Sequence, residues 1–216
     1  MSVGATAQEI IDYAANNMSG IISIDNNTGG STTALGKISS RGNKMSNSPI
    51  WAAAQPNIIS AQGMTLDSNG NIFIADWGNH RIRKVSTSGI ITTVAGMIQG
   101  DTVGLGGFSG DGGPATNAKL NGPFGLAVDA AGNIIFADRN NHRVRKVSTT
   151  GIISTIAGSS TTGNSGNGGP ATAATLNDPT GIAIGKTGII YIVDDNNNVV
   201  RKINSTGTIY AVAGNG

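Results

Sequence analysis

Short runs of alternating apolar and polar residues, separated by turns containing glycine or asparagine, dominate the chain from about residue 58 onward. In the clearest stretch, 125–158, the runs are residues 126–129, 134–137, 144–147 and 152–157. Runs of this length, rich in Val and Ile and bounded by Gly, Asn and Asp, are typical of β-strands. Gly132 suits a turn position with positive φ. The pattern predicts one meander of four antiparallel strands.

This stretch occurs three times. Residues 63–96 have the sequence GMTLDSNGNIFIADWGNHRIRKVSTSGIITTVAG, and residues 125–158, 62 positions later (125 − 63), have GLAVDAAGNIIFADRNNHRVRKVSTTGIISTIAG. Residues 181–214, GIAIGKTGIIYIVDDNNNVVRKINSTGTIYAVAG, are a weaker copy 56 positions further on (181 − 125). Repeated units of this size cover their apolar faces with their neighbours. Because both faces of each meander carry aliphatic residues, we expect radially stacked sheets, an all-β propeller segment.

The landmarks of the copies resemble those of NHL repeats, of the long bacterial kind in which a glycine-rich loop precedes each blade. In the middle copy these landmarks are Gly125-x-Ala127-Val128-Asp129, Gly132-Asn133, Ala137-Asp138 and the run NHRVRK from Asn141 to Lys146. The loop FSGDGGPAT at 108–116 fits the same family and recurs at 164–172. The third copy departs from the pattern at three positions, where it has Gly185, Asn198 and Val199. The resemblance covers about residues 58–216.

The resemblance implies a β-propeller of about six blades. The blades expected here span about 58–96, 120–158 and 176–214, too few to close a ring within one chain. Residues 1–57 lack the landmarks. Their capping-box spacing from Thr6 to Glu9 predicts one short helix, and 21–24 and 34–38 predict short strands. We interpret 1–57 as a docking or anchoring segment, with a degenerate blade as the alternative.

The incomplete ring raises the question of what covers its two open faces. Residues 1–57 cover one of them, or another copy supplies the missing blades, or the sequence is part of a longer protein. We expect association, either with a second copy that completes the ring or with neighbouring subunits, because soluble monomers rarely expose large apolar faces.

Composition narrows the classes of function. Only 12% of the 216 residues are charged and the formal net charge is +2, which by itself indicates no polyanionic partner. The absence of cysteine excludes disulfides and thiolate metal sites. No apolar run has the length of a membrane span, and residues 1–20 lack the pattern of a secretory signal. The resemblance implies an extracellular, cell-surface or virion location, and a cytoplasmic location stays open.

Strand direction places a candidate binding rim. If the first strand of each blade runs from top to bottom, the turns between second and third strands and the loops between blades share the top edge. Long loops on a rigid scaffold commonly carry binding sites. The candidate binding rim consists of Trp77, His80, Arg81, Arg83, Asp111, Arg139, His142, Arg143 and Arg145.

Basic residues recur on the third strand of each copy. They are Arg81, Arg83, Lys84, Arg143, Arg145, Lys146, Arg201 and Lys202. An exposed stripe of this kind favours RNA as an alternative partner, because single-stranded RNA binds positive charge together with aromatic stacking platforms. Aromatic residues are only 4% of the chain, so the favoured interpretation is a solvated outer strand paired with Asp76, Asp138 and Asp194.

The histidines, carboxylates and glycine-rich loops do not predict catalysis. His80 and His142 lie at equivalent positions of different blades, which keeps them apart. We expect Asp76, Asp138 and Asp194 to be structural turn residues, with Asp76 bonded to His80 or Arg81 and Asp138 to His142 or Arg143. Asp194 to Asn198 resembles the start of an EF-hand loop but lacks its Gly and its distal Glu.

The glycine-rich loops lack a P-loop lysine and a following helix. We therefore expect no catalytic residue, no metal and no cofactor. The predicted function is a non-enzymatic binding or structural module for a protein or glycan partner. An RNA-binding module is the alternative, and a propeller lyase or hydrolase comes third.

Overall fold

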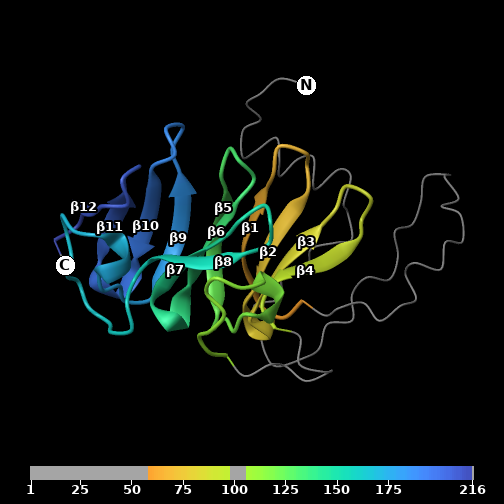
Figure 1. The fold of residues 1–216 in the computed structure, drawn as a ribbon, viewed down its shortest axis with the longest axis horizontal. Helices are drawn as coiled ribbons and strands as arrows, with labels where there is room; N and C mark the ends of the chain where they lie inside the picture. Colours follow the sequence, from red (N-terminus) through yellow and green to blue (C-terminus); the bar gives the residue numbers. More distant parts are fainter. Residues whose placement is uncertain (1–57, 98–105, 216) are drawn as a thin grey trace, which may run out of the picture. The chain divides into compact units, whose positions relative to one another are not determined.

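The computed structural model describes residues 58–97 and 106–215, which form three sheets of four antiparallel strands each (Figure 1). In every sheet the strands pair in chain order, from first to fourth. The prediction of an all-β chain of four-stranded blades is confirmed, and the three blades described form no closed ring. The helix predicted after Thr6, and the rest of 1–57, lie outside the described residues.

Each blade consists of four strands of five or six residues. The first blade contains β1 (Ala61–Leu66), β2 (Ile72–Asp76), β3 (Arg81–Val85) and β4 (Ile91–Ala95). The second contains β5 (Pro123–Val128), β6 (Ile134–Asp138), β7 (Arg143–Val147) and β8 (Ile153–Ala157). The third contains β9 (Pro179–Ile184), β10 (Ile190–Asp194), β11 (Val199–Ile203) and β12 (Ile209–Ala213).

The blades pack face to face through two apolar layers. The first layer joins Phe73 and Ile82 of the first blade to Phe136 and Ile153 of the second. The second layer joins the opposite face of the second blade to the third, with Ile135 packed in the same cluster as Ile192. Every residue of β6 is therefore buried, whereas exposed and buried residues alternate along the end of β10. The second blade has two neighbours, and the third has one in the described residues.

Glycine at the third position of the first strand lets neighbouring blades approach closely. A Cβ on Gly125 would collide with the carbonyl oxygen of Thr180, and a Cβ on Gly63 would lie 2.6 Å from that of Phe124. The first strands β1, β5 and β9 consequently lie side by side. A residue with a side chain at Gly63 or Gly125 would push the blades apart.

The glycine-rich loops do not stay on the top edge, and that prediction is wrong. In the loop before the second blade, Gly112 N–H donates to Ile153 O and Ala115 N–H donates to Gly151 O, which lies in a bottom turn. The short helix η3 (Ala115–Asn117) packs against β4, and Gly96 N–H donates to Ala115 O. The loop therefore fills the space between the outer strands of two blades. The loop before the third blade repeats these bonds.

Candidate functional site

The turns between second and third strands form the part of the candidate rim that does lie at the top. Each turn is a short 3-10 helix, namely η2 (Trp77–Asn79), η4 (Arg139–Asn141) or η6 (Asp195–Asn197). An aspartate precedes each of them. A residue in the left-handed region follows each, namely His80, His142 or Asn198, all with φ 54°. Histidine and asparagine tolerate this region better than most side chains.

Asp138, the aspartate before η4, is fully buried and bonded by three donors. It accepts hydrogen bonds from Asn121 N–H at 2.7 Å, from Asn141 Nδ2 at 2.8 Å and from Arg145 Nη1 at 3.1 Å. Burial raises the pKa of this carboxyl to about 6, against the lowering effect of those bonds. The carboxylate thereby ties the segment before β5 to the turn and to β7.

Asp76 repeats the arrangement in the first blade. Its carboxylate accepts from Ile59 N–H at 2.8 Å and from Asn79 Nδ2 at 2.9 Å, and Arg83 Nη1 lies 3.9 Å away. Neither His80 nor Arg81 forms a hydrogen bond or ion pair with this carboxylate, so the predicted bond to the neighbouring His or Arg is wrong. The reason is geometric, because the left-handed φ at His80 turns that side chain toward the next blade.

Asp194 repeats it in the third blade. It accepts from Asn177 N–H at 2.7 Å and from Asn197 Nδ2 at 2.8 Å, and Arg201 Nη1 lies 3.6 Å away. The residues from Asp194 to Asn198 thus form a turn around a buried carboxylate, as the missing EF-hand glycine and glutamate indicated. The described residues contain no group of three or more His, Cys, Asp or Glu placed to hold a metal ion.

The arginine at the centre of each third strand is buried, so the predicted exposed basic stripe is wrong at Arg83, Arg145 and Arg201, which are 4%, 0% and 0% exposed. Arg145 Nη2 donates to Asp111 Oδ1 at 2.7 Å and to Ser109 O at 3.2 Å. Alternation along the strand sends this side chain into the layer between blades, where the preceding loop binds it.

Arg201 has the same environment with a neutral partner. It donates to Asn167 Oδ1 at 3.0 Å, to Ser165 O at 3.0 Å and to Thr175 O at 2.8 Å. Burial lowers the pKa of this guanidinium from its usual value, and the nearby Asp194 opposes that shift. The recurrent arginines therefore join each glycine-rich loop to the blade that follows it.

The two histidines join successive blades. His80 Nδ1 accepts the backbone N–H of Gly122 at 2.9 Å, and His142 Nδ1 accepts that of Asp178 at 3.1 Å. At His80, an imidazole that accepts at Nδ1 is neutral and carries its proton on Nε2. Burial lowers the pKa of His80 below its usual 6.5, which favours this form. The sequence predicted His80 and His142 on the top rim, but nothing in it indicated that they would bond to the next blade.

The remaining rim residues are partly exposed and make few bonds. Arg139 pairs with Asp178 at 2.8 Å, and the guanidinium carbon of Arg143 lies 3.9 Å from the ring centroid of Phe108. Trp77 and Arg81 are half-buried. Asp111 lies in the glycine-rich loop, bonded to Arg145 and close enough to Arg143 for its charge to act on that guanidinium.

One group of residues at the site was missed from the sequence. Asn79, Asn141 and Asn197 each donate to the buried aspartate three residues earlier. Asn141 and Asn197 donate in addition to Gly107 O and Gly163 O, both at 2.7 Å. The signal was available, because this asparagine is present in all three copies even where the following His and Arg are not.

Family models match most of the described chain. The model described as "Teneurin NHL domain" matches residues 107–165 and 160–216, and the model described as "NHL repeat" matches residues 60–85. The chain belongs to the NHL-repeat family. The predicted family is thereby confirmed. The buried aspartate and arginine, and the asparagine that bonds this aspartate, recur in all three repeats of this chain.

Curated relatives match the same part of the chain. NHL repeat-containing protein 2 of Bos taurus is 33% identical over 157 residues, which is 68% of this chain and 20% of the relative. Teneurin-4 of Mus musculus is 29% identical over 171 residues, which is 73% of this chain and 6% of the relative. The chain spans a fifth or less of these two proteins.

Solved structures share the fold at low identity. A streptogramin B lyase structure matches with a TM-score of 0.50 and 20% identity, covering 73% of this chain and 41% of that one. An auxiliary nutrient binding protein from Bacteroides thetaiotaomicron matches with a TM-score of 0.52 and 23% identity, covering 65% and 36%. Within the described residues, no helix has the length and hydropathy needed to cross a membrane.

Proposed function

We propose that this chain is a non-enzymatic NHL-type scaffold that binds a protein or glycan partner in a surface, secreted or virion assembly. The observation that carries the proposal is the engagement of its reactive side chains in holding blades together. His80 and His142 accept backbone N–H groups of the next blade, and the carboxylate of Asp138 accepts three donors. A general acid or base needs a group free to exchange its proton with a substrate.

The exposed part of the top rim is the proposed contact surface. Trp77 and Arg139 lie on successive turns, η2 and η4, and Gly122 lies beside the indole nitrogen of Trp77. Tryptophan and arginine are the side chains that most often dominate binding interfaces, because they combine large contact areas with hydrogen-bond donors. A rigid pair of turns presenting them suits a protein surface or a sugar ring.

Arrays of purified glycans and a displayed peptide library test this function. Binding to a defined glycan or peptide that falls at least tenfold in both Trp77→Ala and Arg139→Ala supports the rim. The matched control is Lys186→Ala, since Lys186 is exposed in a bottom turn. Binding that is equal in all four proteins would place the contact elsewhere.

An RNA-binding module is the second candidate, favoured by the cations that remain partly exposed on third strands, Arg143 and Lys146 among them. Titration with single-stranded RNA at several salt concentrations separates it from the first. Tight binding that weakens steeply with salt and is lost in Arg143→Ala would replace the protein or glycan proposal with RNA. The lyase fold match adds no residue role, and hydrolysis or lyase activity on a defined substrate would overturn the scaffold.

A further inference from the structure

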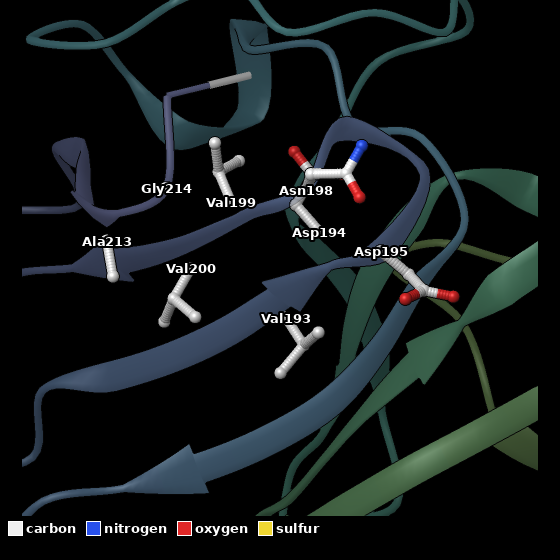
Figure 2. A pocket seen from close by; sticks show the side chains of 8 residues that line it. All are labelled: Val193, Asp194, Asp195, Asn198, Val199, Val200, Ala213 and Gly214. Atoms are coloured by element: carbon white, nitrogen blue, oxygen red, sulfur yellow. The ribbon is translucent and has the colours of Figure 1, made fainter.

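The third blade carries a shallow, open hollow at the top of its free face (Figure 2). Val193 of β10, Val200 of β11 and Ala213 of β12 line it, and Asn198 and Gly214 stand at its upper edge. The hollow is apolar in its centre and polar at its rim. It lies on the face opposite to the one that packs against the second blade, whose contacts include Ile192.

The counterparts of these residues in the second blade are covered by the blade that follows. Ala137 and Ala157 are 0% exposed, whereas Val193, at the position of Ala137, is 39% exposed, and Ala213, at the position of Ala157, is exposed. The first blade has the same buried alanines. The hollow is therefore the place where a further blade would lie.

Two polar groups at the rim of the hollow have counterparts that bond to the following blade. The counterpart of Gly214 is Gly158, whose N–H donates to Ala171 O at 3.0 Å. The counterpart of Asn198 is His142, whose Nδ1 accepts the N–H of Asp178 at 3.1 Å. Within residues 58–97 and 106–215, neither the N–H of Gly214 nor the side chain of Asn198 has a hydrogen-bond partner.

Asn198 preserves the acceptor of the histidine that it replaces. Asparagine Oδ1 and histidine Nδ1 are both bonded to Cγ, so they stand equally far along the side chain. Asn198 and His142 also share the same left-handed φ of 54°. The replacement in the third copy therefore changes the chemical group but keeps an acceptor in the position that receives a backbone N–H.

The first blade presents the complementary groups. Ser60 has φ 53°, close to the 62° of Gly122 and the 52° of Asp178, which are the donors to the two histidines. The N–H of Ser60 has no partner in the described part of the chain. Met64 is 52% exposed, whereas its counterpart Leu126 is 6% exposed in the layer between blades. Within the described residues, the first blade thus has an entering edge that no other blade covers.

We propose that the free face of the third blade binds the first blade of a second copy of this chain, head to tail. The Ser60 N–H of that copy donates to Asn198 Oδ1, and its Met64 packs beside Tyr191 and Val193. This contact continues the two interfaces already present between blades of one chain. This proposal does not rest on the proposed function, because the contact uses the free face of the third blade and not the top rim that carries Trp77 and Arg139.

One adjustment accompanies this contact. Gly181 is the counterpart of Gly63 and Gly125, which the first strand of the next blade approaches closely. In the third blade a methyl group of Val193 covers this glycine instead, since Val193 Cγ2 lies 2.7 Å from where a Cβ on Gly181 would stand. The valine must turn its methyl groups away from Gly181 as the second copy docks. A heterologous contact of this kind closes into a ring or extends into a filament, depending on the rotation between copies.

Light scattering after size exclusion, with the full 216-residue chain, tests the proposal. The chain should run at twice the monomer mass or more. Tyr191→Glu and Met64→Glu, each placing a charge on one of the two faces, should shift it to monomer. Asn198→Ala should weaken association about fivefold, as expected for one lost hydrogen bond. Lys186→Glu, in a bottom turn, is the control that should leave association unchanged.

A mixing experiment separates head-to-tail from symmetric contact. Tyr191→Glu retains an intact first-blade face and Met64→Glu an intact third-blade face, so their mixture should form a heterodimer that neither variant forms alone. Circular dichroism and thermal unfolding confirm that each variant folds. A monomeric wild-type chain, or association that survives both glutamate substitutions, would overturn the proposal. So would a mixture that stays monomeric.

Discussion

Gly122 donates its backbone N–H to His80 Nδ1 at 2.9 Å, across 42 positions of sequence, and this bond joins the first blade to the second. His142 and Asp178 repeat it between the second blade and the third. Because the apolar packing between blades is non-directional, these bonds, together with those from Gly96 N–H to Ala115 O and from Gly158 N–H to Ala171 O, help set the position of one blade on the next. They also give the histidines of this chain a structural role.

Replacing His80 should loosen the first two blades. His80→Ala leaves the N–H of Gly122 without its acceptor and should lower the free energy of unfolding by about 1–2 kcal/mol. His80→Asn retains an acceptor at the same position on the side chain and should cost less than half of that. Urea denaturation at pH 7.5 measures both, and equal losses in the two variants would contradict the role assigned to the acceptor.

The His80 contribution should also depend on pH. Burial lowers its pKa below 6.5, so the unfolded chain takes up this proton at a higher pH than the folded chain. The stability supplied by neutral His80 is present above pH 6.5 and is lost as the pH falls through the folded pKa. The advantage of the wild type over His80→Asn should therefore shrink below pH 6.5, and an advantage that stays constant to pH 5 would contradict it.

Removing Asp138 should cost more than removing an exposed aspartate. Asp138→Ala leaves Asn121 N–H, Asn141 Nδ2 and Arg145 Nη1 without this acceptor, and the expected loss is about 3 kcal/mol. Asp195→Ala is the matched control, because Asp195 follows the equivalent aspartate in the third blade and is exposed. Denaturation midpoints that move equally in the two variants would show that burial of the carboxylate has no special role.

As the pH falls, protonation of Asp138 should raise the free energy of unfolding, whereas protonation of His80 should lower it. Its pKa is raised from 3.8 to about 6, chiefly by burial, so the folded chain takes up this proton first as the pH falls. The stability gained from protonation is fully present below pH 3.8 and is lost as the pH rises through about 6. The difference in unfolding free energy between the wild type and Asp138→Asn should accordingly grow in favour of the wild type from pH 6.5 to pH 4. Carbon-13 shifts of the carboxyl give the midpoint directly, and a midpoint below 4 would contradict the expected direction.

Asp111 should be replaceable by asparagine but not by alanine. Asn167 bonds Arg201 in the third blade as Asp111 bonds Arg145 in the second, so a neutral acceptor suffices there. Asp111→Asn should change the free energy of unfolding by less than about 1 kcal/mol, and Asp111→Ala should lower it by about 1–3 kcal/mol. Thermal unfolding of the two variants side by side checks this, and an equal loss in both would mean that the negative charge is what Arg145 needs.

The sequence determined the parts of a blade because these depend on residues close along the chain. The alternation in 126–157 predicts four strands, and the observed strands β5 to β8 lie within three residues of the predicted ends. The positive φ of Gly132 follows from the turn that it occupies. Recurrence of the copies predicts stacking, because each sheet has two apolar faces and needs neighbours to cover them.

Only the tertiary structure decided which neighbour each polar group meets. Arg143 and Arg145 lie two positions apart on β7 and point to the same face over Phe108, yet Arg145 is buried beside Asp111 whereas Arg143 stays partly exposed. His80 meets Gly122 because its left-handed backbone turns it toward the next blade. These partners lie 34 or more positions apart in the chain, and hydrophobic periodicity carries no information about contacts at that separation. The distance between blades sets them, and it depends on Gly63 and Gly125 where two backbones meet.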